Sequence, residues 1–130
     1  MEALTARDVM SGSVVAVRED LTLAEVSSRL SEAGISGAPV VDAAGSLLGV
    51  VSLADLARTM GEGRGTGGPE LTVRRIMTPI ADTVSEDTTV PEIARIMVAN
   101  QYHRLVVTRR EEPVGIVSSM DLLKLIAELY

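Results

Sequence analysis

One seven-residue stretch occurs twice in this 130-residue chain, and this repetition limits what the chain can fold into. Residues 49–55 read GVVSLAD, and residues 115–121 read GIVSSMD. The opening residues 4–10, LTARDVM, recur in the same way as residues 71–77, LTVRRIM. An internal repeat of this kind predicts two copies of one structural unit. The length suits one domain made of two halves that are too small to be stable alone.

Each copy predicts the same order of elements, β-α-β-β-α, and therefore an α+β fold. Thr-x-x-Glu capping boxes at Thr22 and Thr89 indicate a helix start in each copy. Gly34 is expected to end the first of these helices, and Asn100 to end the second in a left-handed conformation. The expected strands are 14–17, 38–41 and 47–51 in the first copy and 83–84, 105–108 and 114–117 in the second. A last helix is expected from 52 to about 60 and from 118 to the end of the chain.

The two copies divide the chain into repeat 1 at residues 1–60, a glycine-rich linker at residues 61–70 and repeat 2 at residues 71–130. Gly63, Gly65 and Gly68 in the linker match the G-x-G-x-x-G pattern of dinucleotide-binding folds. In those folds the pattern follows a strand and opens a helix, whereas here it follows a helix and runs into a proline. The stretch is therefore interpreted as a flexible linker.

The repeated stretch carries the most specific chemistry in the chain. A short β-branched run ends at Ser52 or Ser118, and a helix begins there, with Asp55 or Asp121 in its first turn. Free N–H groups at a helix start, together with a serine hydroxyl, can hold a phosphate. The aspartate can accept hydrogen bonds from the two vicinal hydroxyls of a ribose.

A purely structural interpretation explains the same residues. Ser-x-x-Asp resembles a capping box, so Ser52 and Asp55 need do no more than begin a helix. Capping does not require the glycine that stands three residues before each serine, at Gly49 and Gly115. A close approach of a ligand or of another chain segment does require it. The duplication favours the ligand-binding interpretation.

Composition excludes several classes of function. The net charge of −6 argues against nucleic acid, because affinity for its backbone comes largely from lysine and arginine. The chain has no cysteine and one histidine, so neither a metal site nor a cofactor is expected. No nucleophile-base pair or P-loop is present, so the protein is not expected to be an enzyme. No leader or membrane span is seen, which predicts a cytoplasmic protein, and the lack of Phe and Trp predicts an aliphatic core.

The doubled pattern closely resembles the cystathionine-β-synthase-type (CBS) domain, and two copies in tandem resemble the CBS pair, or Bateman module. The resemblance rests on Val9-Met10 and Ile76-Met77, on residues 38–42 and 103–107, and on the closing Gly-h-h-Ser-x-x-Asp, where h is apolar. It covers residues 4 to 125. It implies two repeats packed sheet to sheet about a pseudo-twofold axis, with two clefts. Members of this family commonly bind AMP, ADP, ATP or S-adenosylmethionine there and act as regulatory sensors.

The resemblance also implies roles for individual residues. Asp55 and Asp121 would take ribose hydroxyls, with Ser52 and Ser118 near ribose or phosphate. In the family, a threonine on the early extended segment of one copy often completes the cleft of the other copy. Thr83 fits that position, whereas the first copy has Ala16, so the cleft of Ser52, Asp55 and Thr83 is expected to be the better equipped.

His103 and Arg104 match a basic pair that some nucleotide-binding members direct at phosphates. The equivalent Ser36-Gly37 carries no charge, so phosphate binding is expected to be asymmetric. Two other interpretations remain. In the first, Arg104 is a solvated charge at a strand end, paired with a surface carboxylate. In the second, His103 is half-buried beside the Tyr102 ring.

The predicted function is a regulatory module that senses an adenosine-containing ligand and signals to a separate effector protein. The alternative is a CBS pair without a ligand, serving as a dimerisation or interaction unit. A homodimer is expected because the last helix carries too many apolar residues for one inward stripe. Those residues are Leu122, Leu123, Leu125, Ile126 and Leu129.

Overall fold

The computed structural model describes residues 3–12, 14–61, 71–80 and 82–129. It contains two compact units. The first-repeat unit is Val15–Ile80, and the second-repeat unit joins Met1–Val14 to Ala81–Tyr130. The predicted linker at residues 61–70 lies outside the described residues, apart from Gly61.

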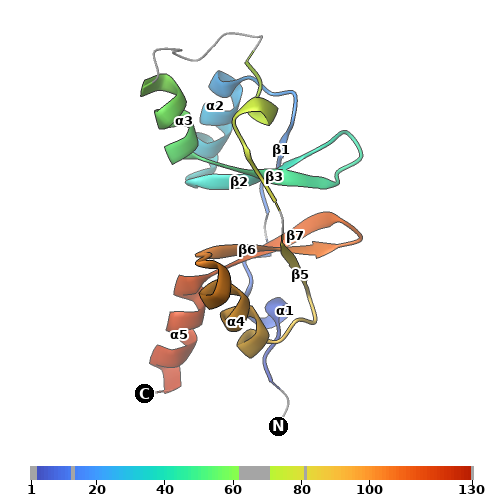
Figure 1. The fold of residues 1–130 in the computed structure, drawn as a ribbon, viewed down its shortest axis with the longest axis vertical. Helices are drawn as coiled ribbons and strands as arrows, with labels where there is room; N and C mark the ends of the chain where they lie inside the picture. The colour runs from blue at the N-terminus through green and yellow to red at the C-terminus, as the bar shows by residue number, and fades with distance from the viewer. Residues whose placement is uncertain (1–2, 13, 62–70, 81, 130) are drawn as a thin grey trace. The chain divides into compact units, whose positions relative to one another are not determined.

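The first-repeat unit has a four-stranded sheet of order β1-β2-β3-β4, with helices α2 and α3 lying together on one side (Figure 1). The hairpin of β2 and β3 is antiparallel, and β1 adds to it in parallel. The elements are β1 (Val17–Arg18), α2 (Leu23–Ala33), β2 (Gly37–Val41), β3 (Leu47–Ser52), α3 (Leu53–Thr59), the 3-10 helix η3 (Val73–Arg75) and β4 (Thr78–Pro79).

The second-repeat unit has a three-stranded sheet of order β5-β6-β7, again with two helices packed on it (Figure 1). The elements are α1 (Ala6–Val9), β5 (Thr83–Ser85), α4 (Val90–Asn100), β6 (Arg104–Arg109), β7 (Glu112–Ser118) and α5 (Ser119–Leu129). The predicted β-α-β-β-α order and the α+β class are therefore confirmed. The first extended piece differs from the prediction, since only Val17 of residues 14–17 lies in a strand, which continues to Arg18.

Both predicted helix starts are observed, with a complete capping box at Thr22 and only the threonine half of one at Thr89. The Thr22 hydroxyl accepts from the backbone N–H of Glu25 at 3.2 Å, and the Glu25 carboxylate accepts from the backbone N–H of Thr22 at 3.1 Å. The Thr89 hydroxyl accepts from the backbone N–H of Glu92 at 3.4 Å. These bonds satisfy amide groups that have no partner within the helix.

The two helices end differently from one another. Gly34 ends α2 as predicted, with a left-handed φ of 65° that a residue without a Cβ adopts at no cost. The prediction for Asn100 was wrong by one residue, because the left-handed residue that ends α4 is Gln101, with φ 58°. Asn100 stays helical, and its side-chain amide donates to the Ile96 carbonyl at 2.9 Å.

Each unit has an aliphatic core, as the composition predicts. In the first-repeat unit, residues such as Val26, Leu30 and Val51 are at most 1% exposed. In the second-repeat unit, Ile93 and Val117 are fully buried. Burying one such side chain contributes about 1.5–3 kcal/mol to the free energy of folding, so these cores hold each sheet to its helices.

The opening turn of the chain packs with the second repeat. The backbone N–H of Ala6 donates to the Thr88 carbonyl at 2.8 Å, and that of Arg7 donates to the Glu86 carbonyl at 3.1 Å. Ser11 then forms an antiparallel bridge with Ile116 of β7. Residues 1–14 thus belong to the fold of the second repeat.

The opening turn of the second copy packs with the first repeat in the same way. The backbone N–H of Val73 donates to the Leu21 carbonyl at 2.9 Å, and that of Arg74 donates to the Glu19 carbonyl at 3.3 Å. β4 then pairs antiparallel with β3. The compact units therefore differ from the sequence repeats, because the two opening segments are exchanged between them.

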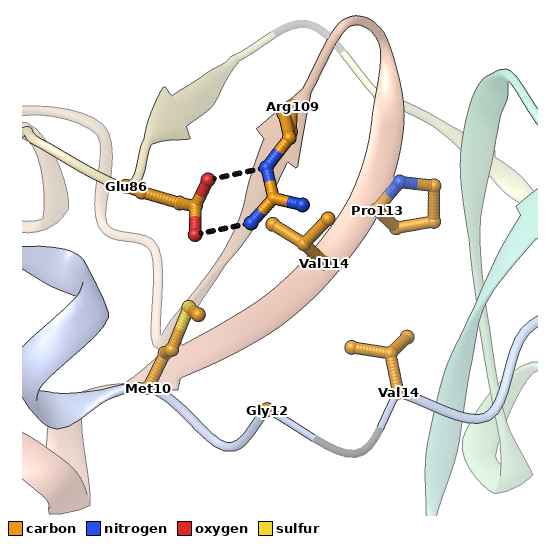
Figure 2. Close-up of a pocket in the computed structure, with 7 residues that line it drawn as sticks. All are labelled: Met10, Gly12, Val14, Glu86, Arg109, Pro113 and Val114. Atoms are coloured by element: carbon orange, nitrogen blue, oxygen red, sulfur yellow. Dashed lines mark hydrogen bonds and ion pairs between the residues drawn. The ribbon is translucent and has the colours of Figure 1, made fainter.

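The exchanged segments explain the glycine in each copy of the repeated stretch. The Met10 side chain lies where a Cβ on Gly115 would be, on the segment that carries Met10, Gly12 and Val14 in Figure 2. A Cβ on Gly49 would lie 2.5 Å from the Thr78 carbonyl oxygen and 2.9 Å from the Met77 sulfur. Of the two close approaches weighed from the sequence, that of a chain segment is therefore the one observed.

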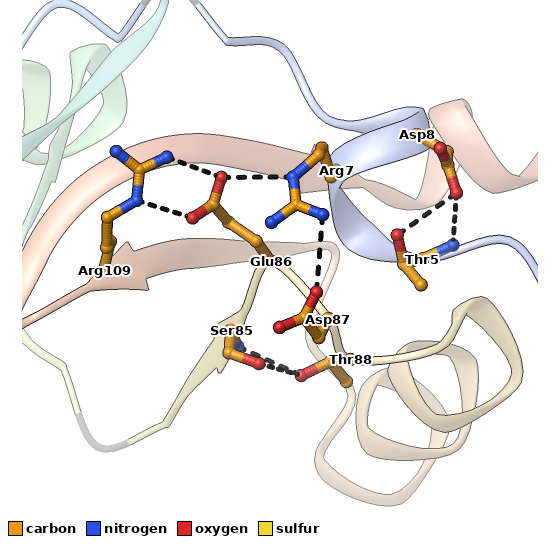
Figure 3. A network of polar contacts seen from close by, with 8 residues as sticks. All are labelled: Thr5, Arg7, Asp8, Ser85, Glu86, Asp87, Thr88 and Arg109. Carbon is orange, nitrogen blue, oxygen red and sulfur yellow. Dashed lines mark hydrogen bonds and ion pairs between the residues drawn. The ribbon is translucent and has the colours of Figure 1, made fainter.

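An ion-pair network fastens the exchanged opening segment of the second-repeat unit (Figure 3). Arg109 holds both oxygens of Glu86, with Nε to Oε1 at 2.7 Å and Nη2 to Oε2 at 2.8 Å. Arg7 reaches the same carboxylate at 3.5 Å and Asp87 at 3.4 Å. The equivalent pair in the first-repeat unit joins Arg74 to Glu19 at 2.5 Å.

The network shifts the acid-base properties of its members. The Arg109 hydrogen bonds, with smaller contributions from the charges of Arg109 and Arg7, lower the pKa of Glu86 below its ordinary value, although burial opposes this. The same pair raises the pKa of Arg109. Since the folded protein favours ionised Glu86, the stabilisation is complete above pH 4.5 and is lost as the pH falls through the lowered pKa.

We therefore expect Glu86→Gln to remove part of the acid dependence of stability. The melting temperature of the parent should fall between about pH 5 and 3 more steeply than that of Glu86→Gln, because the parent has a carboxylate to protonate. Melting curves at a series of pH values would measure this. Glu128→Gln, at an exposed position of α5, is the matched control and should keep the parental slope.

We also expect the two repeat glycines to differ in their tolerance of alanine. Gly49→Ala should cost about 1–3 kcal/mol in the free energy of unfolding, because the new methyl meets a backbone carbonyl. Gly115→Ala should cost less, since the flexible Met10 side chain can move. Urea unfolding would measure both. A Cβ on Gly12 has no heavy atom within 4 Å, so Gly12→Ala should stay within about 0.5 kcal/mol of the parent.

Candidate functional site

Ser52 and Asp55 form a complete capping box at the start of α3. Asp55 Oδ2 accepts the backbone N–H of Ser52 at 2.8 Å and its hydroxyl at 3.0 Å, and the Ser52 oxygen accepts the backbone N–H of Asp55 at 3.2 Å. Asp55 is only 8% exposed. The structural role weighed from the sequence is therefore present, whatever else these residues do.

Arg58 occupies the remaining oxygen of this aspartate. Its Nη2 donates to Asp55 Oδ1 at 2.5 Å. The sequence reasoning did not assign Arg58 to the site, although a basic residue three positions after an acidic one on the same helix was the signal for such a pair. In the described state, Asp55 is thus engaged at both oxygens.

Ser118 and Asp121 repeat the cap at the start of α5 with fewer bonds. Asp121 Oδ2 accepts the backbone N–H of Ser118 at 2.7 Å, and the Ser118 hydroxyl accepts the backbone N–H of Asp121 at 3.2 Å. Asp121 Oδ1 accepts no hydrogen bond from the part of the chain that the structure describes. Lys124, at the position equivalent to Arg58, is exposed.

The predicted basic pair lies beside Ser118. Arg104 pairs with Ser118 across β6 and β7, and the backbone N–H of Ser119 donates to the His103 carbonyl at 2.8 Å. The interpretation of His103 as half-buried is wrong, because the residue is exposed just before the start of β6. Arg104 is also exposed. The side chains of His103 and Arg104 thus lie at the edge of the sheet where α5 begins.

Thr83 lies at the same edge of this sheet. It begins β5, is exposed, and pairs in parallel with Val106 of β6. The first residues of β5 and β6 and the last residue of β7 meet at one edge, because β5 is parallel and β7 antiparallel to β6. The structure therefore brings together Thr83, His103, Arg104, Ser118 and Asp121. Ser52 and Asp55 lie in the other unit, so their cleft with Thr83 stays a prediction.

A pocket of about 430 Å³ opens elsewhere in the second-repeat unit (Figure 2). Its lining residues are Met10, Gly12, Val14, Glu86, Arg109, Pro113 and Val114. None of the residues predicted for ligand binding is among them. The polar side chains in the pocket, Glu86 and Arg109, bind one another, so its charged groups serve first to hold the opening segment.

No group of three or more histidine, aspartate or glutamate side chains in the described part of the chain is placed to hold a metal ion. No helix in that part of the chain has the length and apolar character needed to cross a bilayer.

Comparison with known proteins relates both repeats to one family. Residues 6–62 and residues 73–128 each match the CBS domain. The chain is 32% identical over 121 residues to MJ1232 of Methanocaldococcus jannaschii, an alignment that covers 92% of this chain and 38% of that protein. Its match to MJ0188 of the same organism covers 42% of that protein. The chain thus spans about two fifths of the length of these curated relatives.

Several solved structures with the same fold are at least 25% identical to this chain. The CBS domain of a membrane protein from Sphaerobacter thermophilus has 33% identity and a TM-score of 0.82, covering 95% of this chain and 88% of that one. The CBS domain pair of protein MJ0100, in complex with 5′-methylthioadenosine and S-adenosyl-L-methionine, has 25% identity and a TM-score of 0.80, covering 94% and 98%. With both repeats matched and the predicted fold observed, the chain belongs to the CBS domain family, as a tandem pair of CBS repeats.

Proposed function

We propose that this protein is a regulatory module that binds an adenosine-containing ligand, AMP, ADP, ATP or S-adenosylmethionine, and passes the signal to a separate effector protein. The observation that carries the proposal is the group at the sheet edge of the second-repeat unit. There Asp121 lies beside Ser118 and the exposed pair His103 and Arg104, and its Oδ1 accepts no hydrogen bond from a described residue. The complex of the MJ0100 domain pair with two adenosine compounds supports the same ligand class.

The chemistry of this edge suits a nucleoside with a polar or charged 5′ substituent. An aspartate oxygen accepts a ribose hydroxyl, and the positive end of the α5 helix dipole favours negative charge nearby. Arg104 and His103 add donors for phosphate oxygens. None of these groups forms a nucleophile-base pair, so the proposed role is ligand binding and not catalysis. The proposed location is the cytoplasm. The Ser52, Asp55 and Thr83 cleft is proposed as the second site.

A second candidate function, a dimerisation or interaction unit, is favoured by the surface of α5. Of the five apolar residues predicted to be exposed, Leu123, Ile126 and Leu129 are 55%, 53% and 77% exposed. Leu122 packs against the core, and Leu125 is half-buried. Exposed apolar residues grouped on one helix are typical of a protein interface. A homodimer is compatible with ligand binding, so the two candidate functions do not exclude one another.

We expect AMP to stabilise the protein through its ribose hydroxyls. At about 100 times its dissociation constant, a ligand adds roughly 2.7 kcal/mol, which raises the melting temperature by several degrees. In thermal melts, 2′-deoxy-AMP should give a smaller rise, because the aspartate keeps an unpaired acceptor. The double variant Asp55→Ala/Asp121→Ala, compared with and without AMP, should lose the rise. An absence of any shift with every adenosine ligand would leave the interaction unit as the function.

We expect the protein to be a homodimer through α5. Light scattering at micromolar concentration should give twice the chain mass of 13.7 kDa. Leu123→Glu should produce a monomer, because it places a charge within the apolar face. Val98→Glu is the matched control, since Val98 is 80% exposed on α4, outside that face. A mass of one chain for the parent would contradict this prediction.

A further inference from the structure

We propose that Arg58 competes with the ligand for Asp55, so that the first-repeat site is closed by an internal ion pair and the site at Asp121 fills first. This inference rests on the proposed function and adds a regulatory residue to it. It also reverses the order of the two sites expected from Thr83 and Ala16. The observation behind it is a difference between two aspartates at equivalent positions. Arg58 binds Asp55, whereas the equivalent Lys124 forms no ion pair with a described residue.

Asp55 has little capacity left for a ligand. A carboxylate accepts about four hydrogen bonds, two at each oxygen. Ser52 takes both positions of Oδ2, with its backbone N–H and its hydroxyl, and Arg58 takes one position of Oδ1. Two vicinal hydroxyls need two acceptor positions on a side chain that is here only 11% exposed. A ribose can therefore use both hydroxyls only after Arg58 has moved away.

Asp121 is open in comparison. It is half-buried, and among the described residues only Ser118 binds its carboxylate, through a backbone N–H on Oδ2. Lys124 replaces Arg58 at the equivalent position and forms no ion pair with a described residue. The planar arginine fork is preorganised to hold a carboxylate, whereas lysine carries a strongly hydrated point charge on a flexible stem. The two repeats thus share the aspartate and differ in the residue that controls access to it.

The expected strength of this competition is modest. The Arg58 side chain is 63% exposed, and ion pairs of this kind contribute little in water. Removing the pair should therefore change the ligand affinity by about twofold to fivefold. Such a factor sets the order in which two similar sites fill and leaves both usable.

The test measures adenosine binding by calorimetry on variants of the 130-residue chain that each keep one aspartate. Adenosine carries the ribose diol without a phosphate, so a contact between Arg58 and phosphate cannot mask the effect. In an Asp121→Ala background, Arg58→Gln should bind adenosine about twofold to fivefold more tightly. In an Asp55→Ala background, Lys124→Arg should bind it more weakly by a similar factor.

The unliganded melting temperature of each variant separates competition from a purely structural role. Loss of the ion pair should lower it slightly while the affinity rises, whereas a structural role would lower it without tightening binding. An adenosine affinity that does not change on Arg58→Gln would overturn the proposed competition. It would not contradict the proposed function. No adenosine binding by the parent or by any variant would overturn the proposed function and, with it, the competition.

Discussion

The exchange of the two opening segments is the constraint on which both units depend. Ala6 and Arg7 place two backbone N–H groups on carbonyls of the second repeat, and Val73 and Arg74 do the same on the first. Each sheet then gains a pairing partner along its last strand. Neither repeat is complete from its own continuous sequence, so the two copies must fold as parts of one protein.

The repeated Gly-h-h-Ser-x-x-Asp stretch serves this architecture before it serves a ligand. Its glycine admits Met10 or a backbone carbonyl, and its serine and aspartate satisfy the first amides of a helix. The proposed binding site therefore uses groups that already stabilise the fold. For the same reason, a substitution at either aspartate acts on the helix start as well as on the proposed site.

Departures from the repeat give the units their individual properties. Glu86 is held by Arg109, whereas the equivalent Glu19 is paired with Arg74 alone among the described residues. Arg58 binds Asp55, whereas one oxygen of Asp121 has no hydrogen-bond donor among the described residues. The two repeats thus share a backbone plan and differ in electrostatics.

The local features of this protein could be predicted from the order of its residues. Local patterns were enough to predict the duplication, the helix starts at Thr22 and Thr89 and the helix end at Gly34, because each depends on residues close in the chain. The α+β class follows from the same patterns. Other features follow from three-dimensional packing. These are the segments that lie against Gly49 and Gly115, the pairing of Glu86 with Arg109, and the contact of Arg58 with Asp55. The exchange and the Glu86–Arg109 pair join residues far apart in sequence, and no local pattern specifies such pairs. The Arg58 contact is local, but the spacing that permits it is equally present at Lys124, so side-chain geometry had to decide between them.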